Sequence, residues 1–285
     1  MDAVNATTRS MTVETTDGRA GRNETELTYR VAGEGPPVVL LHGIGLDSAS
    51  VSWRHTLPAL ASNHRVYALD LPGHGESGRP RVRYTTDFFR DVLASFLDEL
   101  NLHGSSLVGI SMGGGIALGH ALEHDVERLV LVDSYGLGTD APWRPAASAM
   151  LRMPGASQGW WSTIQASRSS VRQHLRNLTA DAPSDDHVDD VYDAIQDSAV
   201  GRAMSSWQRS EFRYSGLKTC HLDELDELDA PTLFVHGEDD PLLPASWSKR
   251  GAEKTDASLE LFENCGHWPS REAPERFNRV LASFL

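Results

Sequence analysis

Short apolar runs alternate with helical patterns along this 285-residue chain. Continuous apolar runs of this kind are typical of strands that are buried on both faces of a sheet. The runs that we interpret as such strands cover residues 38–41, 65–69, 107–108, 129–132, 232–236 and 259–262. Because alternating strands and helices are joined by right-handed crossovers, the pattern predicts an α/β fold with a mostly parallel, twisted sheet flanked by helices.

The segments between and around these runs supply the remaining elements of the predicted core. A helix is expected at residues 87–100, with Thr85 or Thr86 as its cap. The polar residues before Met11 are expected to be loosely held. Two N-terminal strands joined by a glycine-containing turn are expected at residues 11–15 and 26–32, and further helices at residues 112–123, 246–254 and 274–285.

The alternation stops between residues 137 and 229. This segment carries no strong strand signal, contains four of the seven tryptophans, and includes helical stretches at residues 169–178 and 188–198. A helical segment of this length between two strands is better explained as a cap than as a loop. We therefore expect a core formed by residues 1–136 and 230–285, with an inserted helical cap at 137–229.

The pentapeptide at residues 109–113 reads Gly-Ile-Ser-Met-Gly and lies between a predicted strand and a predicted helix. A strand that turns directly into a helix must fold back tightly, and small residues two before and two after Ser111 leave room for that turn. The turn strains the backbone of Ser111 and points its hydroxyl into the cleft beyond the strand ends. The pattern therefore predicts that Ser111 is a nucleophile.

A serine hydroxyl needs a base to act as a nucleophile at neutral pH. Among the 12 histidines, His267 follows the last predicted strand, at the carboxyl edge of the sheet where ligands bind in open α/β folds. Asp239 and Asp240 follow the preceding strand at the same edge, and either could orient the imidazole. The order serine, aspartate, histidine along the chain is that of α/β-hydrolases.

The segment His42-Gly43-Ile44-Gly45 follows the first buried strand. The backbone N–H of Ile44 can point at the same oxyanion as the N–H of Met112, which begins the helix after the serine. We interpret His42 as a brace for this loop rather than as a second base. Asp70 ends another strand, and we expect it to stabilise a structural turn.

Taken together, these motifs resemble the α/β-hydrolase superfamily with a cap, in the group of esterases, haloperoxidase-like hydrolases, epoxide hydrolases and meta-cleavage-product (carbon–carbon bond) hydrolases. The resemblance covers about residues 25–136 and 230–285. It implies Ser111 as nucleophile, His267 as base and Asp240 as acid, with Asp239 as the runner-up.

The nucleophile separates the members of this group. Epoxide hydrolases and haloalkane dehalogenases have an aspartate at the position of Ser111, which disfavours both. Carbon–carbon hydrolases resemble the chain at Gly266-His267-Trp268 but commonly have asparagine where Ile110 stands, and they use a cap arginine. The candidates for that arginine are Arg168, Arg172, Arg176 and Arg209.

The sequence thus predicts a cofactor-independent serine hydrolase that cleaves an ester, or a related acyl bond, of a small to medium, fairly apolar substrate. Gly43, Gly45 and Trp268 are expected to line the substrate site. Two alternatives are a meta-cleavage-product carbon–carbon hydrolase and a non-catalytic binding protein of the same fold. Acyl transfer is a further possibility.

The net charge of −14 disfavours nucleic acid and anionic membranes as partners. With 40 acidic residues and three lysines, the composition favours adaptation to high salt. The N-terminus lacks the pattern of a secretory signal, so a cytoplasmic location is expected. Two cysteines, Cys220 and Cys265, do not form a disulfide framework in a chain of this length. The oligomeric state is left open.

Three other patterns are given structural interpretations. His120 and His124 have the spacing of metal ligands but lack a third one. Gly113-Gly114-Gly115 is not followed by the lysine of a phosphate-binding loop. The aspartates at positions 185, 186, 189 and 190 lack the glycine and glutamate of a calcium loop. We therefore expect no metal site.

Overall fold

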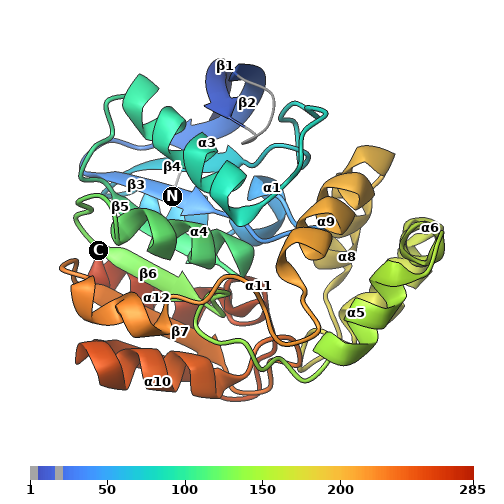
Figure 1. Cartoon of the computed structure of the whole chain (residues 1–285). Coiled ribbons are helices and arrows are strands. Elements are labelled where there is room, and N and C mark those ends of the chain that lie inside the picture. The colour runs from blue at the N-terminus through green and yellow to red at the C-terminus, as the bar shows by residue number, and fades with distance from the viewer. Residues whose placement is uncertain (1–5, 17–21) are drawn as a thin grey trace.

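An eight-stranded sheet forms the centre of the computed structural model, which describes residues 6–16 and 22–285 (Figure 1). The strand order is β1-β2-β4-β3-β5-β6-β7-β8. β1 and β2 are antiparallel to each other, β2 is antiparallel to β4, and every other neighbouring pair is parallel. The mostly parallel sheet predicted from the sequence is confirmed.

The strands coincide with the apolar runs and extend several of them. Their bounds are β1 Thr7–Thr16, β2 Arg22–Ala32, β3 Pro37–Leu41, β4 Arg65–Asp70, β5 Ser106–Ile110, β6 Leu129–Val132, β7 Thr232–Gly237 and β8 Ser258–Phe262.

For residues 7–10 the expectation of a loosely held chain was wrong. Residues 1–5, and the glycine-containing turn expected between the two N-terminal strands, lie outside the described residues. Thr7 pairs with Val31 and Ser10 pairs with Thr28 in the β1–β2 ladder. The polar side chains of this segment are exposed on an edge strand, where composition does not reveal the backbone pairing.

Helices cover both faces of the sheet. Thr85 caps α3 (Thr86–Glu99) by accepting a hydrogen bond from the N–H of Phe88 at 3.0 Å, which settles the choice between the two threonines. The other helices of the core are α1 Ala49–Ser52, α2 Thr56–Leu60, α4 Met112–Ala121, α10 Ala245–Thr255, α11 Pro269–Glu272 and α12 Pro274–Phe284, with a 3-10 helix at Leu222–Glu227.

Neighbouring strand residues pack into different layers because successive side chains point to opposite faces. Leu41 packs with the buried residues of α3 and α4, such as Phe96 and Ile116. Leu40 packs in the opposite layer with Phe277 of α12. Both strand residues are fully buried, which explains why this run is apolar throughout.

Between β6 and β7 the chain forms helices and no sheet strand. In Figure 1 these helices lie beyond the end of the sheet to which the arrow of β6 points, which is the carboxyl edge. We call them the inserted helices: α5 Arg144–Arg152, α6 Ala156–Gln165, α7 Arg168–Leu175, α8 Asp185–Ala194 and α9 Ser198–Glu211. None of the helices in the described residues has the length and apolar content needed to cross a bilayer.

Candidate active site

Ser111 lies at the junction of β5 and α4. Its φ of 54° and ψ of −120° are strained for a residue with a Cβ. Gly109 and Gly113 permit the turn, because a Cβ on Gly109 would overlap the backbone of Gly113. The N–H of Ser111 donates to the carbonyl of Val132 at 2.9 Å, which fixes the turn against β6. The backbone therefore presents this serine at the carboxyl edge of the sheet.

His267 and Asp240 lie side by side at the same edge. Nδ1 of His267 is 2.8 Å from Oδ2 of Asp240, and both side chains are buried. Oδ1 of Asp240 accepts a hydrogen bond from the N–H of Leu242 at 2.7 Å. Asp239, by contrast, is exposed, and its N–H donates to the carbonyl of Cys265. The structure thus places Asp240 against the imidazole, and not Asp239.

The charges around His267 favour its protonated form. Burial alone would lower the pKa of His267, but the carboxylates of Asp240, Asp133 and Asp47 raise it to about 9. Burial opposes the charged form of Asp240 too, yet the neighbouring His267 and His236 hold the pKa of that carboxyl below its usual value. The pair is therefore suited to stabilise an imidazolium beside a carboxylate.

The loop after β3 approaches Ser111 closely. A Cβ on Gly43 would lie 3.3 Å from Cβ of Ser111. The N–H of Gly43 donates to Oδ2 of Asp47 at 2.7 Å, which fixes the loop. Within the described residues, the N–H groups of Ile44 and Met112 form no hydrogen bond. Met112 is the first residue of α4, so its N–H has no partner within the helix.

Two buried histidines support this loop from below. Nε2 of His42 accepts a hydrogen bond from the N–H of Leu71 at 2.9 Å, so this ring braces the loop as expected. Nε2 of His74 accepts one from the N–H of Gly45 at 3.0 Å. Burial, and then the neighbouring His42, lower the pKa of His74 well below its usual value. A neutral ring is what this accepting role requires.

The chain matches the model of the alpha/beta hydrolase family over residues 38–280. The chain is an α/β-hydrolase. It is 31% identical over 269 residues to a 2-hydroxy-6-oxo-6-(2'-aminophenyl)hexa-2,4-dienoic acid hydrolase of Metapseudomonas resinovorans, covering 91% of this chain and 87% of the relative. It is also 31% identical over 273 residues to a 2-hydroxymuconate semialdehyde hydrolase of Pseudomonas sp. strain CF600, covering 89% and 88%.

Solved structures give the same picture. A meta-cleavage product hydrolase of Pseudomonas fluorescens IP01 aligns with this α/β-hydrolase at a TM-score of 0.77 and 28% identity, over 96% of each chain. A putative aryl esterase of Burkholderia cenocepacia aligns at 0.72 and 25%, over 97% of each chain. These relatives are thus named as hydrolases of more than one kind of bond.

The inserted helices of the hydrolase contact both loops of the site. The carbonyl of Leu178, just after α7, accepts a hydrogen bond from the N–H of His267 at 2.9 Å. On α9, Met204 lies so close to Gly45 that a Cβ on that glycine would overlap its sulfur. Residues far apart in the sequence therefore hold the two loops in place from above the sheet.

Trp268 of the hydrolase is buried behind the base. Its Nε1 donates to Oγ of Ser52 at 3.2 Å, and its ring packs edge-on against His187 with 5.5 Å between the ring centroids. Ser52 in turn donates to Asp47, which holds Gly43. Trp268 thus links the histidine loop to the loop after β3, and its contact with substrate stays a prediction.

Sequence reasoning missed several functional neighbours. Asp133 and His236 are fully buried beside Asp240, and Asp47 fixes the loop next to Ser111. Asp133 and His236 occupy the carboxyl ends of two predicted strands, and this position is the signal that could have identified them. Asp70 acts as expected, because its carboxylate accepts hydrogen bonds from the N–H groups of Ala49 and Glu76.

The acidic run of the hydrolase is neutralised by arginines. Each of its four aspartates forms an ion pair within the described residues, which supports a structural role for the run. The pairs are Arg172–Asp185, Arg271–Asp186, Arg168–Asp189 and Arg54–Asp190.

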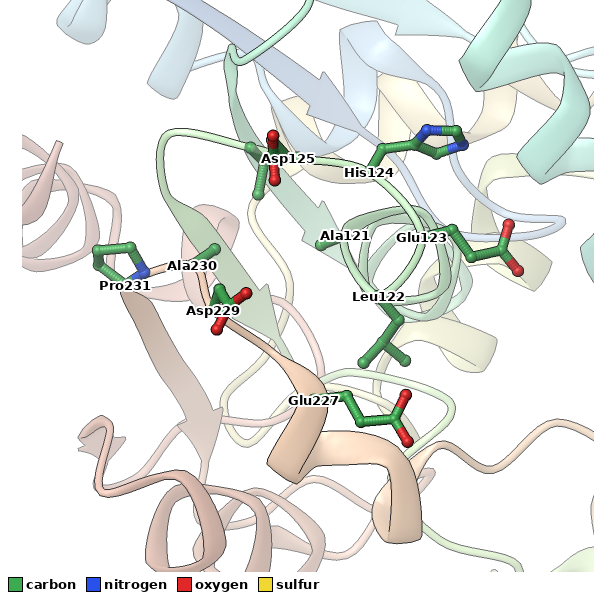
Figure 2. Close-up of a pocket in the computed structure, with 10 residues that line it drawn as sticks. Ala121, Leu122, Glu123, His124, Asp125, Glu227, Asp229, Ala230 and Pro231 are labelled. Carbon is green, nitrogen blue, oxygen red and sulfur yellow. The ribbon is translucent and has the colours of Figure 1, made fainter.

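A surface pocket lies at the opposite edge of the sheet from the nucleophile. It is formed by the end of α4 and the residues that lead into β7, as Figure 2 shows. Four carboxylates line it: Glu123, Asp125, Glu227 and Asp229. His124 also lines the pocket, and the ring of His120 stacks on the ring of His124 with 4.5 Å between the ring centroids. None of the residues that line this pocket belongs to the site described above.

Proposed function

We propose that the chain is a cofactor-independent serine hydrolase with Ser111 as nucleophile, His267 as base and Asp240 as acid. The observation that carries this proposal is the 2.8 Å contact between His267 and Asp240. This pair lies at the same edge of the sheet as Ser111, whose backbone is strained. The neutral form of His267, whose share grows as the pH rises toward its pKa of about 9, accepts the proton of the Ser111 hydroxyl as the serine oxygen attacks a carbonyl carbon. Asp240 holds the imidazole tautomer and stabilises the imidazolium.

The tetrahedral intermediate is stabilised by the N–H groups of Ile44 and Met112, which are free of other partners in the described residues. The protonated His267 then gives its proton to the leaving group. Water, activated by the same imidazole, releases the acyl group from Ser111 and restores the enzyme.

We propose a neutral ester of a small to medium, fairly apolar acid as the substrate. Asp240, Asp133 and Asp47 are the strongest charges acting on His267, and an anionic substrate would meet their repulsion. The four candidates for the cap arginine of carbon–carbon hydrolases are engaged elsewhere or exposed. Arg168 and Arg172 pair with aspartates of α8, and Arg176 and Arg209 lie on the surface.

Carbon–carbon bond hydrolysis is the second candidate, and the relatives favour it. Several relatives of 30–31% identity are named as hydrolases of ring-cleavage dienoates or semialdehydes. The chain departs from that group at Ile110, where its members commonly have asparagine. A non-catalytic binding protein is the third candidate. The strained turn at Ser111 and the His267–Asp240 pair at the same edge of the sheet argue against it.

We further propose that residues 137–229 form a cap over the substrate site, on a core of residues 1–136 and 230–285. The contacts of Leu178 and Met204 with the two site loops support this division. A cap of this kind would exclude large polymers and admit small molecules. Gly43, Gly45 and Trp268 would be among the residues that surround the bound molecule.

A fluorophosphonate probe and two kinds of substrate, nitrophenyl esters and a dienoate, test the proposed chemistry. We expect the wild-type protein to be labelled at Ser111 and to hydrolyse nitrophenyl esters, with Ser111→Ala inactive in both assays. The exposed Ser62→Ala is the matched control and should behave as wild type. Loss of the visible chromophore of a dienoate, without ester turnover, would favour the carbon–carbon reaction. Activity that survives Ser111→Ala would refute the triad.

A further inference from the structure

Asp133 is a buried carboxyl that the reaction above does not use. It follows β6 directly and has a φ of 40°, a left-handed conformation that is uncommon for a residue other than glycine. Its N–H donates to the carbonyl of Val235 at 2.9 Å, and its Oδ1 accepts from the N–H of Gly237 at 2.9 Å. Backbone contacts to β7 therefore fix the direction of this side chain.

The second oxygen of Asp133 is unsatisfied. Within the described residues, Oδ2 is buried and has no hydrogen-bond partner. Buried polar atoms without partners are rare in folded proteins, and they often indicate a functional role. A carboxylate oxygen of Asp133, one of Asp240 and a ring nitrogen of His267 all lie within 4.8 Å of one another. Asp133 thus faces the base from a second direction.

The groups that face Asp133 come from β7 and the two loops at the same edge. Nε2 of His236 lies 3.5 Å from Oδ1 of Asp133, and Asp240 and His267 are the other charged neighbours of Asp133. Burial raises the pKa of the Cys265 thiol, and the charge of Asp133 adds to this rise. Burial raises the pKa of Asp133 to about 7 against the attraction of His236, and Asp240 adds to the rise.

We propose that Asp133 is a second positioning carboxyl for His267, an inference that rests on the proposed triad. Its carboxylate shares in stabilising the imidazolium that forms when Ser111 gives up its proton. It can also accept the Nδ1–H hydrogen bond of His267 when Asp240 is removed. No atom is transferred to Asp133 in this role, so it remains a positioning residue.

The first test is the pH profile of Asp133→Asn, which keeps the acceptor for Gly237. The Asp133 carboxylate raises the pKa of His267, so its loss should move the acid limb of kcat/KM to lower pH. We expect kcat above that limb to fall about three- to tenfold. Asp125→Asn makes the same charge change at the far pocket and should leave the profile unchanged.

The second test compares two changes at Asp240. Asparagine there would donate to Nδ1 and hold the wrong tautomer, so Asp240→Asn should lose on the order of 10⁴-fold in kcat. Alanine leaves Nδ1–H open to Asp133, so Asp240→Ala should lose only about 10²-fold. Adding Asp133→Asn to Asp240→Ala should remove that advantage. Circular dichroism and thermal unfolding identify any variant that fails to fold.

The two proposals fail in different ways. Full activity of Ser111→Ala or His267→Ala would refute the triad itself. If both are inactive, but Asp133→Asn leaves the acid limb in place and Asp240→Ala is no more active than Asp240→Asn, the triad stands and the role of Asp133 is refuted. Should Asp240→Ala not fold, the pH profile of Asp133→Asn decides alone.

Discussion

Oε2 of Glu272 accepts a hydrogen bond from the N–H of Gly266 at 3.0 Å. Its Oε1 accepts one from the N–H of Trp268 at 3.0 Å, so a single carboxylate holds both neighbours of His267. Oε2 also accepts from the N–H of Ala180, in the segment after the inserted helix α7, at 2.8 Å. The position of the base is therefore coupled to the inserted segment through one side chain.

Replacing Glu272 should reduce both stability and turnover. Glu272→Ala leaves three N–H groups without their acceptor, and we expect a loss of about 2–4 kcal/mol in the free energy of unfolding. We expect kcat to fall at least about tenfold, with less effect on KM, because His267 loses its position. Glu272→Gln keeps an acceptor oxygen and should lie between. Exposed Glu275→Ala is the control, and equal effects at both positions would contradict the coupling.

The stability of the fold should depend on pH through His267. Burial opposes its charge, but Asp240 raises the folded-state pKa to about 9, above the unfolded value of about 6.5. The stabilisation is thus fully present below pH about 6.5 and is lost as the pH rises through 9. Urea unfolding of wild type and His267→Gln should show a stability difference that shrinks over this range. A constant difference would rule out the raised pKa.

Arg271 should be important for attachment of α8 to the core. Its buried guanidinium donates to the carbonyl of Val51 at 2.9 Å and pairs with Asp190 at 2.8 Å and Asp186 at 3.2 Å. Arg271→Ala removes the side-chain donor to the Val51 carbonyl and both ion pairs, leaving the two aspartates with Arg54, and we expect a loss of about 2–4 kcal/mol. The control is Arg168→Ala on the exposed face of α7, which should leave the melting temperature unchanged. Similar melting curves for the two variants would contradict this role.

Gly113 and Gly159 should respond in opposite directions to the same substitution. A Cβ on Gly113 would overlap the backbone carbonyls of Leu41 and His42, so Gly113→Ala should displace the loop after β3 and abolish most activity. Gly159 lies within α6 and has open space around the same position. Gly159→Ala should therefore raise stability by up to about 1 kcal/mol without affecting turnover. Thermal unfolding and ester turnover of both variants check the contrast.

The sequence alone determined the sheet, the tight turn at Ser111, and the order of serine, aspartate and histidine along the chain. Buried parallel strands must be apolar on both faces, so residues 38–41 and 129–132 could be identified as strands without any contact information. The glycines on either side of Ser111 indicate a tight turn, and this turn could be predicted because all the residues that form it are neighbours in the sequence. The first part of the edge strand β1, residues 7–10, was missed, because its pairing uses backbone groups that leave little mark on composition.

Only the tertiary structure decided which groups meet. Asp239 and Asp240 are adjacent and chemically alike, and the choice between them depends on which side of the turn after β7 faces His267. The same holds for Asp133, whose distance from the base arises from the pairing of β6 with β7. Local patterns specify backbone shape, whereas contacts between distant segments depend on strand order and packing, which no single window of sequence contains.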